Sequence, residues 1–301
     1  MRLAITGGTG FVGSHLVDCA LAAGHEVTAL TRREQAPRAR VTWVSGDLHD
    51  RTALERLVSD ADAVIHVAGV ISGQRAATFE KGNVEGTLAM LAAATAGGVR
   101  RFVHVSSLAA REPKLSLYGG SKAKAEELVH RSGLDWAIVR PPAVYGPGDK
   151  ETLELFRMAK LGLMLMPPKG RVSVIHADDL ARLLQALAAA RASSKVLVEP
   201  DDGKAGGWTH REFARALAAA VGTRPAILSS PGILLRLAAR ADQLLRRDKA
   251  KLTVDRAAYF SHRNWVVEPK RTAPPGLWRP QIETVQGLRQ TAEWYRQQGW
   301  L

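Results

Sequence analysis

Cysteine is almost missing from this chain, since Cys19 is the only one among 301 residues. A single cysteine excludes an intramolecular disulfide and a cysteine-rich metal site, so we expect no metal centre and a reducing compartment. Cys19 lies beside Val17, Ala20 and Leu21 in a predicted helix. A small thiol in such surroundings is expected to pack in the core rather than to act as a nucleophile.

Long hydrophobic runs are missing as well. No apolar stretch reaches the roughly 20 residues that a membrane-spanning helix needs. The chain opens directly into a strand-like segment, and no basic-then-apolar leader stands in front of it. These features together predict a cytoplasmic protein.

Acidic residues are few relative to basic ones. The chain has 42 Lys+Arg against 29 Asp+Glu, which gives a net charge of +13 and a pI near 10.3. Such an excess can attract nucleic acid or an anionic membrane, but the basic residues are scattered rather than gathered in an arm, and we expect no nucleic-acid partner. Residues 234–252 combine basic residues with leucines at helical spacing. That segment is interpreted as a packing helix, with contact to a membrane surface or closure of a pocket as alternatives.

Short β-branched segments alternate with helical stretches through the first 140 residues. Strands are predicted at 3–6, 27–31, 41–44, 63–67, 102–106 and 136–139. This alternation predicts βαβ units in a doubly wound parallel sheet of the Rossmann type, an α/β fold. Proline and glycine then break the pattern. We therefore expect a dinucleotide-binding domain at 1–150, with contributions from about 171–199, and a smaller, partly discontinuous substrate lobe at 151–301.

Glycines cluster directly after the first predicted strand, in the segment Thr6-Gly7-Gly8-Thr9-Gly10-Phe11-Val12-Gly13. A tight turn between a strand and a helix needs glycine so that the backbone can approach a pyrophosphate and the helix can pack on the strand. Glycine spacing alone is weak evidence, but its place inside a βαβ unit strengthens it. The segment therefore predicts a dinucleotide phosphate site.

The end of the second strand bears on the choice of cofactor. Thr31 is followed by Arg32 and Arg33, with no carboxylate before Glu34. An acidic residue at this position would bind the 2′-hydroxyl of NAD, whereas arginine suits the 2′-phosphate of NADP. NADP(H) is therefore favoured; NAD(H) remains the alternative, with both arginines facing solvent. Asp47 after the third strand could receive the adenine amino group or cap the following turn.

A tyrosine and a lysine share one face of a predicted helix over 118–130. Tyr118 and Lys122 are four residues apart, and a nearby ammonium lowers the pKa of a tyrosine. Upstream, Ser106 and Ser107 end an apolar strand at the edge where ligands bind in such sheets. A serine there can hydrogen-bond a substrate carbonyl. The arrangement predicts a carbonyl reductase site.

These motifs resemble the extended short-chain dehydrogenases/reductases, which include NAD-dependent epimerase/dehydratases and 3β-hydroxysteroid dehydrogenase-like reductases. The resemblance is dense up to about residue 179 and thin from there to about 283. The matching segments are 6–13, 46–48, 66–69, 83–87, 106–107, 118–122, 140–148, 176–181, 287–289 and 293–295.

The resemblance implies roles for individual residues. Tyr118 is the implied general acid/base, Lys122 its helper and Ser107 the hydroxyl that orients the carbonyl, with Ser106 as the second choice. Asn83 is expected to hold a helix rather than to react, and a homodimer is implied by relatives. The expected cofactor-binding residues are Gly7, Gly10, Phe11, Val12, Gly13, Arg32, Arg33, Asp47, Leu48, Ala68, Gly69, Tyr118, Lys122, Pro141 and Val144.

The spacing between the two catalytic motifs bears on the small-molecule substrate. Ser107 and Tyr118 are separated by only 118 − 107 = 11 positions, whereas the resemblance implies a longer insert in nucleotide-sugar epimerases. Residues 161–167 are strongly apolar, which suits a hydrophobic ligand. The chain is predicted to reduce a mid-sized, largely apolar ketone or aldehyde. The alternatives are a nucleotide-sugar epimerase or dehydratase and a non-catalytic dinucleotide-binding scaffold.

Overall fold

The computed structural model describes residues 1–190, 194–232, 237, 239–240, 242, 253–274 and 276–301. The chain divides into two compact units. The first comprises residues 1–141, 178–200 and 270–279, and the second comprises 142–177, 201–269 and 280–301.

The first unit is built on a seven-stranded parallel sheet with the strand order β11-β6-β5-β4-β1-β2-β3. Its strands are β1 (Arg2–Thr6), β2 (Glu26–Thr31), β3 (Val41–Ser45), β4 (Ala63–His66), β5 (Arg101–Val105), β6 (Asp135–Val139) and β11 (Val196–Val198). The chain runs outward from β1 to β3 and then returns to place β4 on the other side of β1. Ligands of such sheets bind where the order reverses, at the carboxyl ends of the strands.

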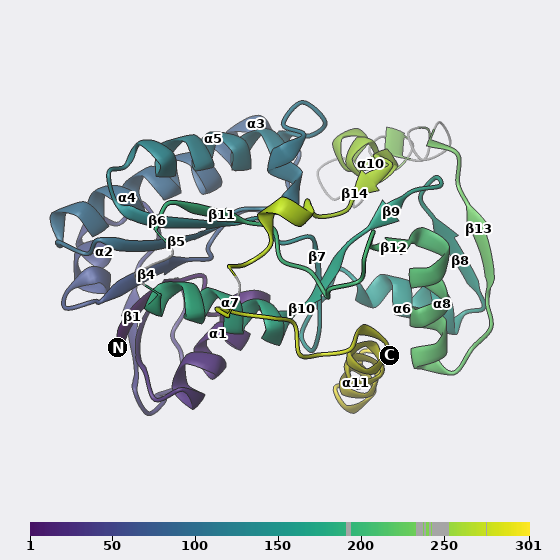
Figure 1. Cartoon of the computed structure of the whole chain (residues 1–301), viewed down its shortest axis with the longest axis horizontal. Coiled ribbons are helices and arrows are strands. Elements are labelled where there is room, and N and C mark those ends of the chain that lie inside the picture. The colour runs from purple at the N-terminus through teal and green to yellow at the C-terminus, as the bar shows by residue number, and fades with distance from the viewer. Residues whose placement is uncertain (191–193, 233–236, 238, 241, 243–252, 275) are drawn as a thin grey trace. The chain divides into compact units, whose positions relative to one another are not determined.

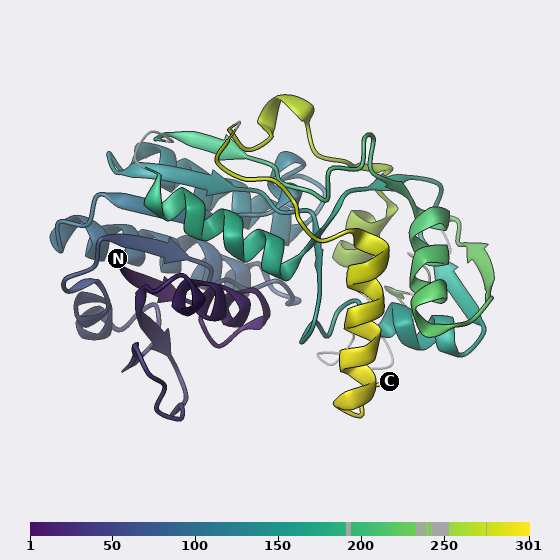
Figure 2. The same cartoon turned by 60° about the horizontal axis from the view of Figure 1, so that its bottom comes forward.

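Helices cover both faces of this sheet (Figure 1). On one face α2 (Arg51–Val58), α4 (Gly86–Ala96) and α5 (Leu117–Arg131) lie side by side and bury an apolar core. On the other face α1 (Phe11–Ala22) lies beside α7 (Ala177–Ala189), which Figure 2 brings to the front. The Cys19 thiol of α1 donates to the Gln185 side chain of α7 at 2.9 Å. Strands buried on both faces explain the continuous apolar runs of the sequence.

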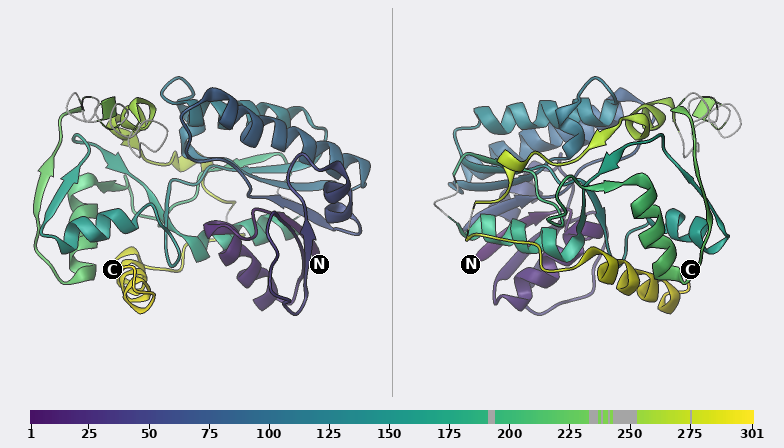
Figure 3. Two further views of the ribbon diagram at one scale, coloured as in Figure 1. Left: turned by 180° about the vertical axis from the view of Figure 1, so that it is seen from behind. Right: turned by 45° about the vertical axis from the view of Figure 1, so that its right-hand side comes forward.

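The second unit packs three helices around its own core. They are α6 (Leu153–Lys160), α8 (His210–Val221) and α11 (Thr284–Gln297), and α8 and α11 lie side by side (Figure 3). A capping box of Thr209 and Glu212 begins α8, and Gly222 with φ +78° ends it. The Tyr295 hydroxyl donates to the Asp149 carbonyl at 2.5 Å and ties α11 to the start of the unit.

Short strand pairs complete the second unit. β7 (Ala143–Tyr145) pairs with β10 (Val174–His176), and β8 (Leu163–Met166) pairs with β13 (Ala226–Ser229), both in parallel. β9 (Arg171–Val172) lies between β12 (Trp208–Thr209) and β14 (Asn264–Trp265). Helix α10 spans Val254–Ser261.

The predicted Rossmann-type fold is confirmed, and the six predicted strands of the first 140 residues end within one residue of those observed. The unit boundaries differ from the predicted ones. Residues 142–150 and 171–177 lie in the second unit, because β7 and β10 pair with each other rather than with the large sheet. Residues 270–279 lie in the first unit, where the Glu199 N–H donates to the Arg271 carbonyl at 2.7 Å.

Two further predictions concern the apolar stretch at 161–167 and the basic helix at 234–252. The apolar stretch at 161–167 contains β8, whose Met164 and Met166 are core residues of the second unit. The basic helix predicted at 234–252 lies outside the described residues, apart from isolated positions. Among the residues that are described, no helix has both the length and the apolar character needed to cross a bilayer.

Candidate active site

The glycine-rich turn after β1 makes backbone-to-backbone contacts that leave no room for side chains. Gly7 has φ +73°, and a Cβ there would lie 2.8 Å from the backbone nitrogen of Ala68 after β4. A Cβ on Gly13 would lie only 1.9 Å from the Gly7 carbonyl oxygen. Glycine is required at both positions because the turn, the loop after β4 and the first turn of α1 meet directly.

The N-terminus of α1 faces this turn without a side-chain cap. Gly10 occupies the N-cap position, and the first turn, which contains the predicted residues Phe11, Val12 and Gly13, has no acidic residue. The first N–H groups of a helix have no acceptor within the helix, and together with the helix dipole they favour an anion. The turn and helix therefore fit a pyrophosphate group.

A cavity of about 410 Å³ lies where β2 and β3 end. Arg32, Gly46 and Asp47 line it, together with Ser45, His49 and Asp50. Arg33 is exposed and is not part of the lining; its backbone N–H donates to the Thr31 hydroxyl at 3.2 Å. Of the two predicted arginines, Arg32 therefore borders the cavity.

Asp47 performs the capping role that the sequence had left open. Its carboxylate accepts the His49 N–H at 2.8 Å, while it also lines the cavity beside Arg32. Leu48 points elsewhere: a Cβ on Gly86 of α4 would lie 2.7 Å from the Leu48 Cδ1 atom. The side chain of Leu48 thus anchors the loop on α4, and Asp47 lies beside Arg32 in the lining of the cavity.

A buried polar chain connects β1, β4 and α4. The Ala68 N–H donates to the Thr6 hydroxyl at 3.2 Å, and Thr6 Oγ1 lies 2.7 Å from His66 Nδ1. His66 Nε2 lies 3.2 Å from the Thr87 hydroxyl, which donates to a backbone carbonyl at 2.6 Å. Burial lowers the pKa of His66 to about 3, so the ring is neutral. These partners assign the proton to Nε2, and the chain fixes the loop that carries Ala68.

Asn83 joins the same loop to α5 from within a π-helical turn (η1, Glu80–Glu85). Its side-chain oxygen accepts the Val70 N–H at 2.6 Å, and its amide donates to the Val70 carbonyl at 2.9 Å and the Ser121 hydroxyl at 2.8 Å. A Cβ on Gly69 would lie 3.0 Å from Asn83 Oδ1 and 3.1 Å from Lys122 Nζ. Asn83 therefore holds the loop and helix in register, and Gly69 leaves the space beside the lysine open.

Tyr118 and Ser107, two of the three catalytic residues predicted from the sequence, are joined by a side-chain hydrogen bond. Ser107 is buried at the carboxyl edge of the sheet, and its hydroxyl accepts the Ala109 N–H at 3.2 Å. Burial raises the pKa of the Tyr118 phenol, and a hydrogen bond with the Ser107 side chain partly offsets that effect. The predicted lowering of the Tyr118 pKa by Lys122 is wrong for this structure, because desolvation outweighs the other influences. A protonated phenol at neutral pH suits a general acid.

Lys122 is buried one helical turn after Tyr118 on α5. Its ammonium donates to the Val105 carbonyl at 3.0 Å, at the end of β5. Burial lowers the pKa of Lys122 to about 8, although the Glu126 carboxylate acts in the opposite direction. An ammonium has three donors, so Lys122 retains donors for a ligand while it is anchored to the sheet.

An ion-pair network that sequence reasoning missed lies behind these residues. The Ser106 hydroxyl donates to Glu126 Oε1 at 2.5 Å, and Arg140 donates to both Glu126 oxygens at 2.8 and 2.6 Å. Arg140 also lies 3.4 Å from the buried Glu199 carboxylate, which Arg111 approaches at 3.5 Å. The Ser106 hydroxyl is therefore engaged with Glu126, whereas Ser107, the first choice of the sequence analysis, is not part of this network. No local sequence pattern signalled this network, because Glu126 lies on α5, Arg140 follows β6 and Glu199 follows β11.

The last two predicted residues lie in different units. Pro141 ends the first segment of the first unit, and its carbonyl accepts the Leu108 N–H at 3.0 Å, which holds the segment after Ser107. Val144 lies on β7 in the second unit, opposite Ile175 of β10. The predicted cofactor contact of Val144 stays a prediction.

Comparison with known proteins agrees with this geometry. Residues 3–198 match the model of the NAD dependent epimerase/dehydratase family. The chain belongs to this family. The resemblance to extended short-chain dehydrogenases/reductases inferred from the sequence is thereby confirmed.

Individual relatives indicate which class of enzyme the chain belongs to. The chain is 38% identical to a ceramide reductase of Caulobacter vibrioides over 309 residues, which covers 99% of this chain and 96% of that protein. It is 30% identical to a 3-beta-hydroxysteroid dehydrogenase of Mycolicibacterium neoaurum, over 50% of this chain and 49% of that one. Its fold is similar to that of the Bordetella bronchiseptica enzyme WbmH in complex with NAD+, with a TM-score of 0.77 and 20% identity over 99% of both chains. The chain is an NAD(P)-dependent oxidoreductase of the extended short-chain dehydrogenase/reductase type.

Proposed function

We propose that this family member is an NADPH-dependent ketoreductase whose substrate is a keto lipid that yields a ceramide on reduction. The observation that carries the proposal is the 38% identity to the Caulobacter ceramide reductase across 99% of the chain. A long-chain amide lipid also agrees with the largely apolar substrate predicted from the sequence. The short segment between Ser107 and Tyr118 supports a reductase over a nucleotide-sugar enzyme.

The proposed chemistry uses three side chains of the first unit. The bound dinucleotide supplies the hydride that reduces the carbonyl carbon. Tyr118 donates its phenolic proton to the carbonyl oxygen, which becomes a hydroxyl group. The Ser107 hydroxyl, already paired with Tyr118, orients that oxygen. Lys122 would use its remaining donors to hold the ribose of a bound cofactor, and its charge would stabilise the tyrosinate left after proton transfer.

The proposed cofactor preference rests on Arg32. Its place in the cavity of about 410 Å³ at the ends of β2 and β3 suits a 2′-phosphate. The uncapped start of α1 would hold the pyrophosphate, while Asp47 and Gly46 would face the adenosine. Arg33, outside the lining, contributes long-range charge only.

The test is a turnover assay with purified protein and a keto-lipid precursor of ceramide, dispersed in detergent. We expect NADPH oxidation with formation of a product two hydrogen atoms heavier by mass spectrometry, and much slower turnover with NADH. A steroid ketone and UDP-glucose serve as competing substrates. Turnover of either competitor with no reduction of the keto lipid would overturn the proposed substrate.

A further inference from the structure

Large apolar side chains are exposed along one strand pair of the second unit. Four leucines around β8 and β13 show much of their surface: Leu161 is 84% exposed, Leu163 44%, Leu165 54% and Leu228 53%. We call these four residues the leucine face. Single exposed leucines are ordinary, but several on adjacent strands form a patch that needs a partner.

The strand register places three of these leucines on one side of the pair. In the parallel ladder Leu163 lies opposite Ala226, and Leu165 lies opposite Leu228. Because side chains alternate along a strand, Met164 and Met166 point the other way, into the core of the second unit. The alternation of side chains along the strands therefore places the methionines in the core and the leucines on the surface.

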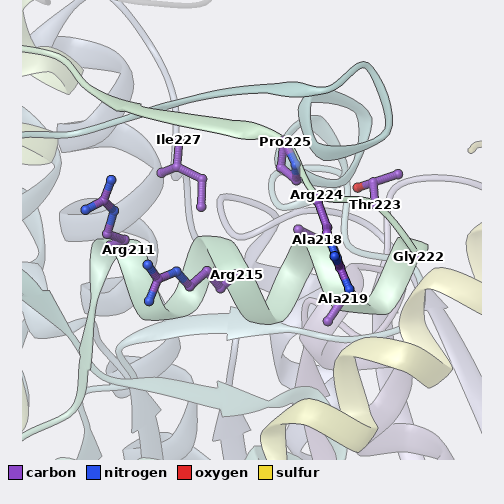
Figure 4. Close-up of a pocket in the computed structure, with 9 residues that line it drawn as sticks. All are labelled: Arg211, Arg215, Ala218, Ala219, Gly222, Thr223, Arg224, Pro225 and Ile227. Carbon is purple, nitrogen blue, oxygen red and sulfur yellow. The ribbon is translucent and has the colours of Figure 1, made fainter.

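A basic hollow lies on the opposite side of β13. Arg211 and Arg215 of α8 and Arg224 after it border a cavity of about 550 Å³, and Ile227 of β13 points into it (Figure 4). The rest of the lining is small or apolar: Ala218, Ala219, Gly222, Thr223 and Pro225. We call the three arginines the arginine hollow.

Among the described residues, no carboxylate lines the arginine hollow. All three arginines are exposed, and among the described residues none of them forms an ion pair with a carboxylate. Arg211 and Arg215 are one turn apart on α8, an arrangement that is unfavourable for like charges. Exposed guanidinium groups without carboxylate partners suit external phosphate groups.

We propose that β8, β13 and α8 form a surface that docks on anionic lipid bilayers. The leucine face enters the boundary between headgroups and acyl chains, and the arginine hollow, behind the edge strand, binds the phosphate layer. The apolar side chains would then lie deeper in the membrane than the long cationic side chains. This arrangement is typical of elements that lie in a membrane interface. The surface belongs to the second unit, whereas the three side chains proposed for catalysis belong to the first, and the proposal does not depend on the substrate assigned to them.

A bilayer suits this surface better than a second copy of the chain. The chain carries a net charge of +13, and this charge disfavours the close approach of a second copy. An anionic lipid surface attracts juxtaposed basic residues and also receives leucines. A soluble anion would explain the arginines but leave the leucine face without a partner.

The experiment is co-sedimentation of the full chain with vesicles, either of phosphatidylcholine alone or mixed with phosphatidylglycerol. One variant combines Arg211→Gln, Arg215→Gln and Arg224→Gln, and a second combines Leu163→Ser, Leu165→Ser and Leu228→Ser. A control with the same charge loss combines Arg51→Gln, Arg131→Gln and Arg289→Gln, three other exposed arginines. Thermal unfolding checks that every variant folds.

We expect binding to the mixed vesicles that weakens with salt, and little binding to phosphatidylcholine alone. Each test variant should lower the partition coefficient by about tenfold or more, and the control should lower it far less. The proposal is wrong if the wild type does not bind the mixed vesicles, or if the control loses as much binding as the arginine variant. It is also wrong if sedimentation velocity shows a wild-type dimer that the leucine variant abolishes while vesicle binding is unchanged.

Discussion

At the scale of single residues, burial sets the chemistry of the candidate site. Tyr118 and Lys122 lie one turn apart on α5, and desolvation favours the neutral form of each, raising the pKa of the phenol and lowering that of the ammonium to about 8. The phenol therefore keeps its proton at neutral pH. This state suits reduction, in which the enzyme must donate a proton, better than oxidation, in which it must accept one.

Replacement of Tyr118 by phenylalanine removes the proton donor and little else. We expect the rate of carbonyl reduction to fall by about 10²–10⁴-fold, the usual contribution of a positioned acid. NADPH affinity and the melting temperature should stay close to those of the wild type. Rapid-quench turnover and fluorescence titration of NADPH check both expectations, and near-normal turnover would remove Tyr118 from the mechanism.

The pH dependence of reduction should reflect Lys122. Its pKa of about 8 means that the ammonium is present below that pH and lost above it. We expect kcat/KM for reduction, and NADPH affinity with it, to fall as the pH rises through about 8. Lys122→Arg should move this loss to higher pH, since arginine stays protonated. A flat profile in the wild type up to about pH 10 would contradict the assignment.

Arg32 and Arg33 form a matched pair of neighbours with different surroundings. Arg32 borders the cavity at the ends of β2 and β3, whereas Arg33 does not. Arg32→Ala should weaken NADPH binding by about tenfold or more while NADH binding changes little. Arg33→Ala, which removes the same charge, should have a much smaller effect in the same calorimetric titration. Equal losses in the two variants would indicate that net charge alone attracts NADPH.

At the scale of elements, the contact between the turn after β1 and the first turn of α1 leaves no room for a Cβ atom at Gly13. A Cβ on Gly13 would lie 1.9 Å from the Gly7 carbonyl oxygen, so the helix would have to move away from the turn. Gly13→Ala should therefore cost about 1–3 kcal/mol of unfolding free energy, as overpacking does, and weaken dinucleotide binding at least tenfold. Ser14→Ala, at an exposed position of the same turn, is the control. Urea unfolding and NADPH titration measure both effects.

At the scale of the whole molecule, the protein should lose stability in acid through its buried histidines. Burial lowers the pKa of His66 to about 3 and that of His104 well below its ordinary value. Between about pH 6.5 and 3 the unfolded chain binds a proton on His66 that the native chain excludes, so stability falls as the pH falls. Each such group contributes a slope of about 1.4 kcal/mol per pH unit.

His66→Gln isolates this contribution. We expect the variant to be less stable than the wild type at pH 7, since the links to Thr6 and Thr87 are altered. The dependence of its unfolding free energy on pH between about 4 and 6 should be flatter by about one proton. Urea unfolding at several pH values gives this slope directly, and equal slopes in both proteins would exclude His66 as the source.

The distribution of the basic residues looks different along the sequence and in the folded protein. Along the sequence the basic residues are scattered, which gave no reason to single out α8. In the structure Arg211, Arg215 and Arg224 border one cavity without carboxylate partners in the described part of the chain. The clustering of these three arginines around one cavity, rather than the net charge of +13, identifies the surface that we propose to bind a membrane.

Features that depend on neighbours in the chain could be predicted from the residues alone. The glycine spacing from Gly7 to Gly13 specifies a turn, the four-residue separation of Tyr118 and Lys122 specifies a helix face, and apolar runs between helices specify buried parallel strands. These patterns are short-range, and six strands of the parallel sheet and the helix face shared by Tyr118 and Lys122 followed from them.

Features that depend on distant segments required the folded chain. The buried ion pairs of Arg140 with Glu126 and Glu199 join α5 to the ends of two strands, and no local sequence pattern predicts these contacts. The segment Leu163–Met166 is apolar throughout, so only its pairing with β13 and packing on the core separate methionines inside from leucines outside. Likewise the Tyr118 pKa rises rather than falls, because burial is a property of the surrounding fold and not of the four-residue spacing to Lys122.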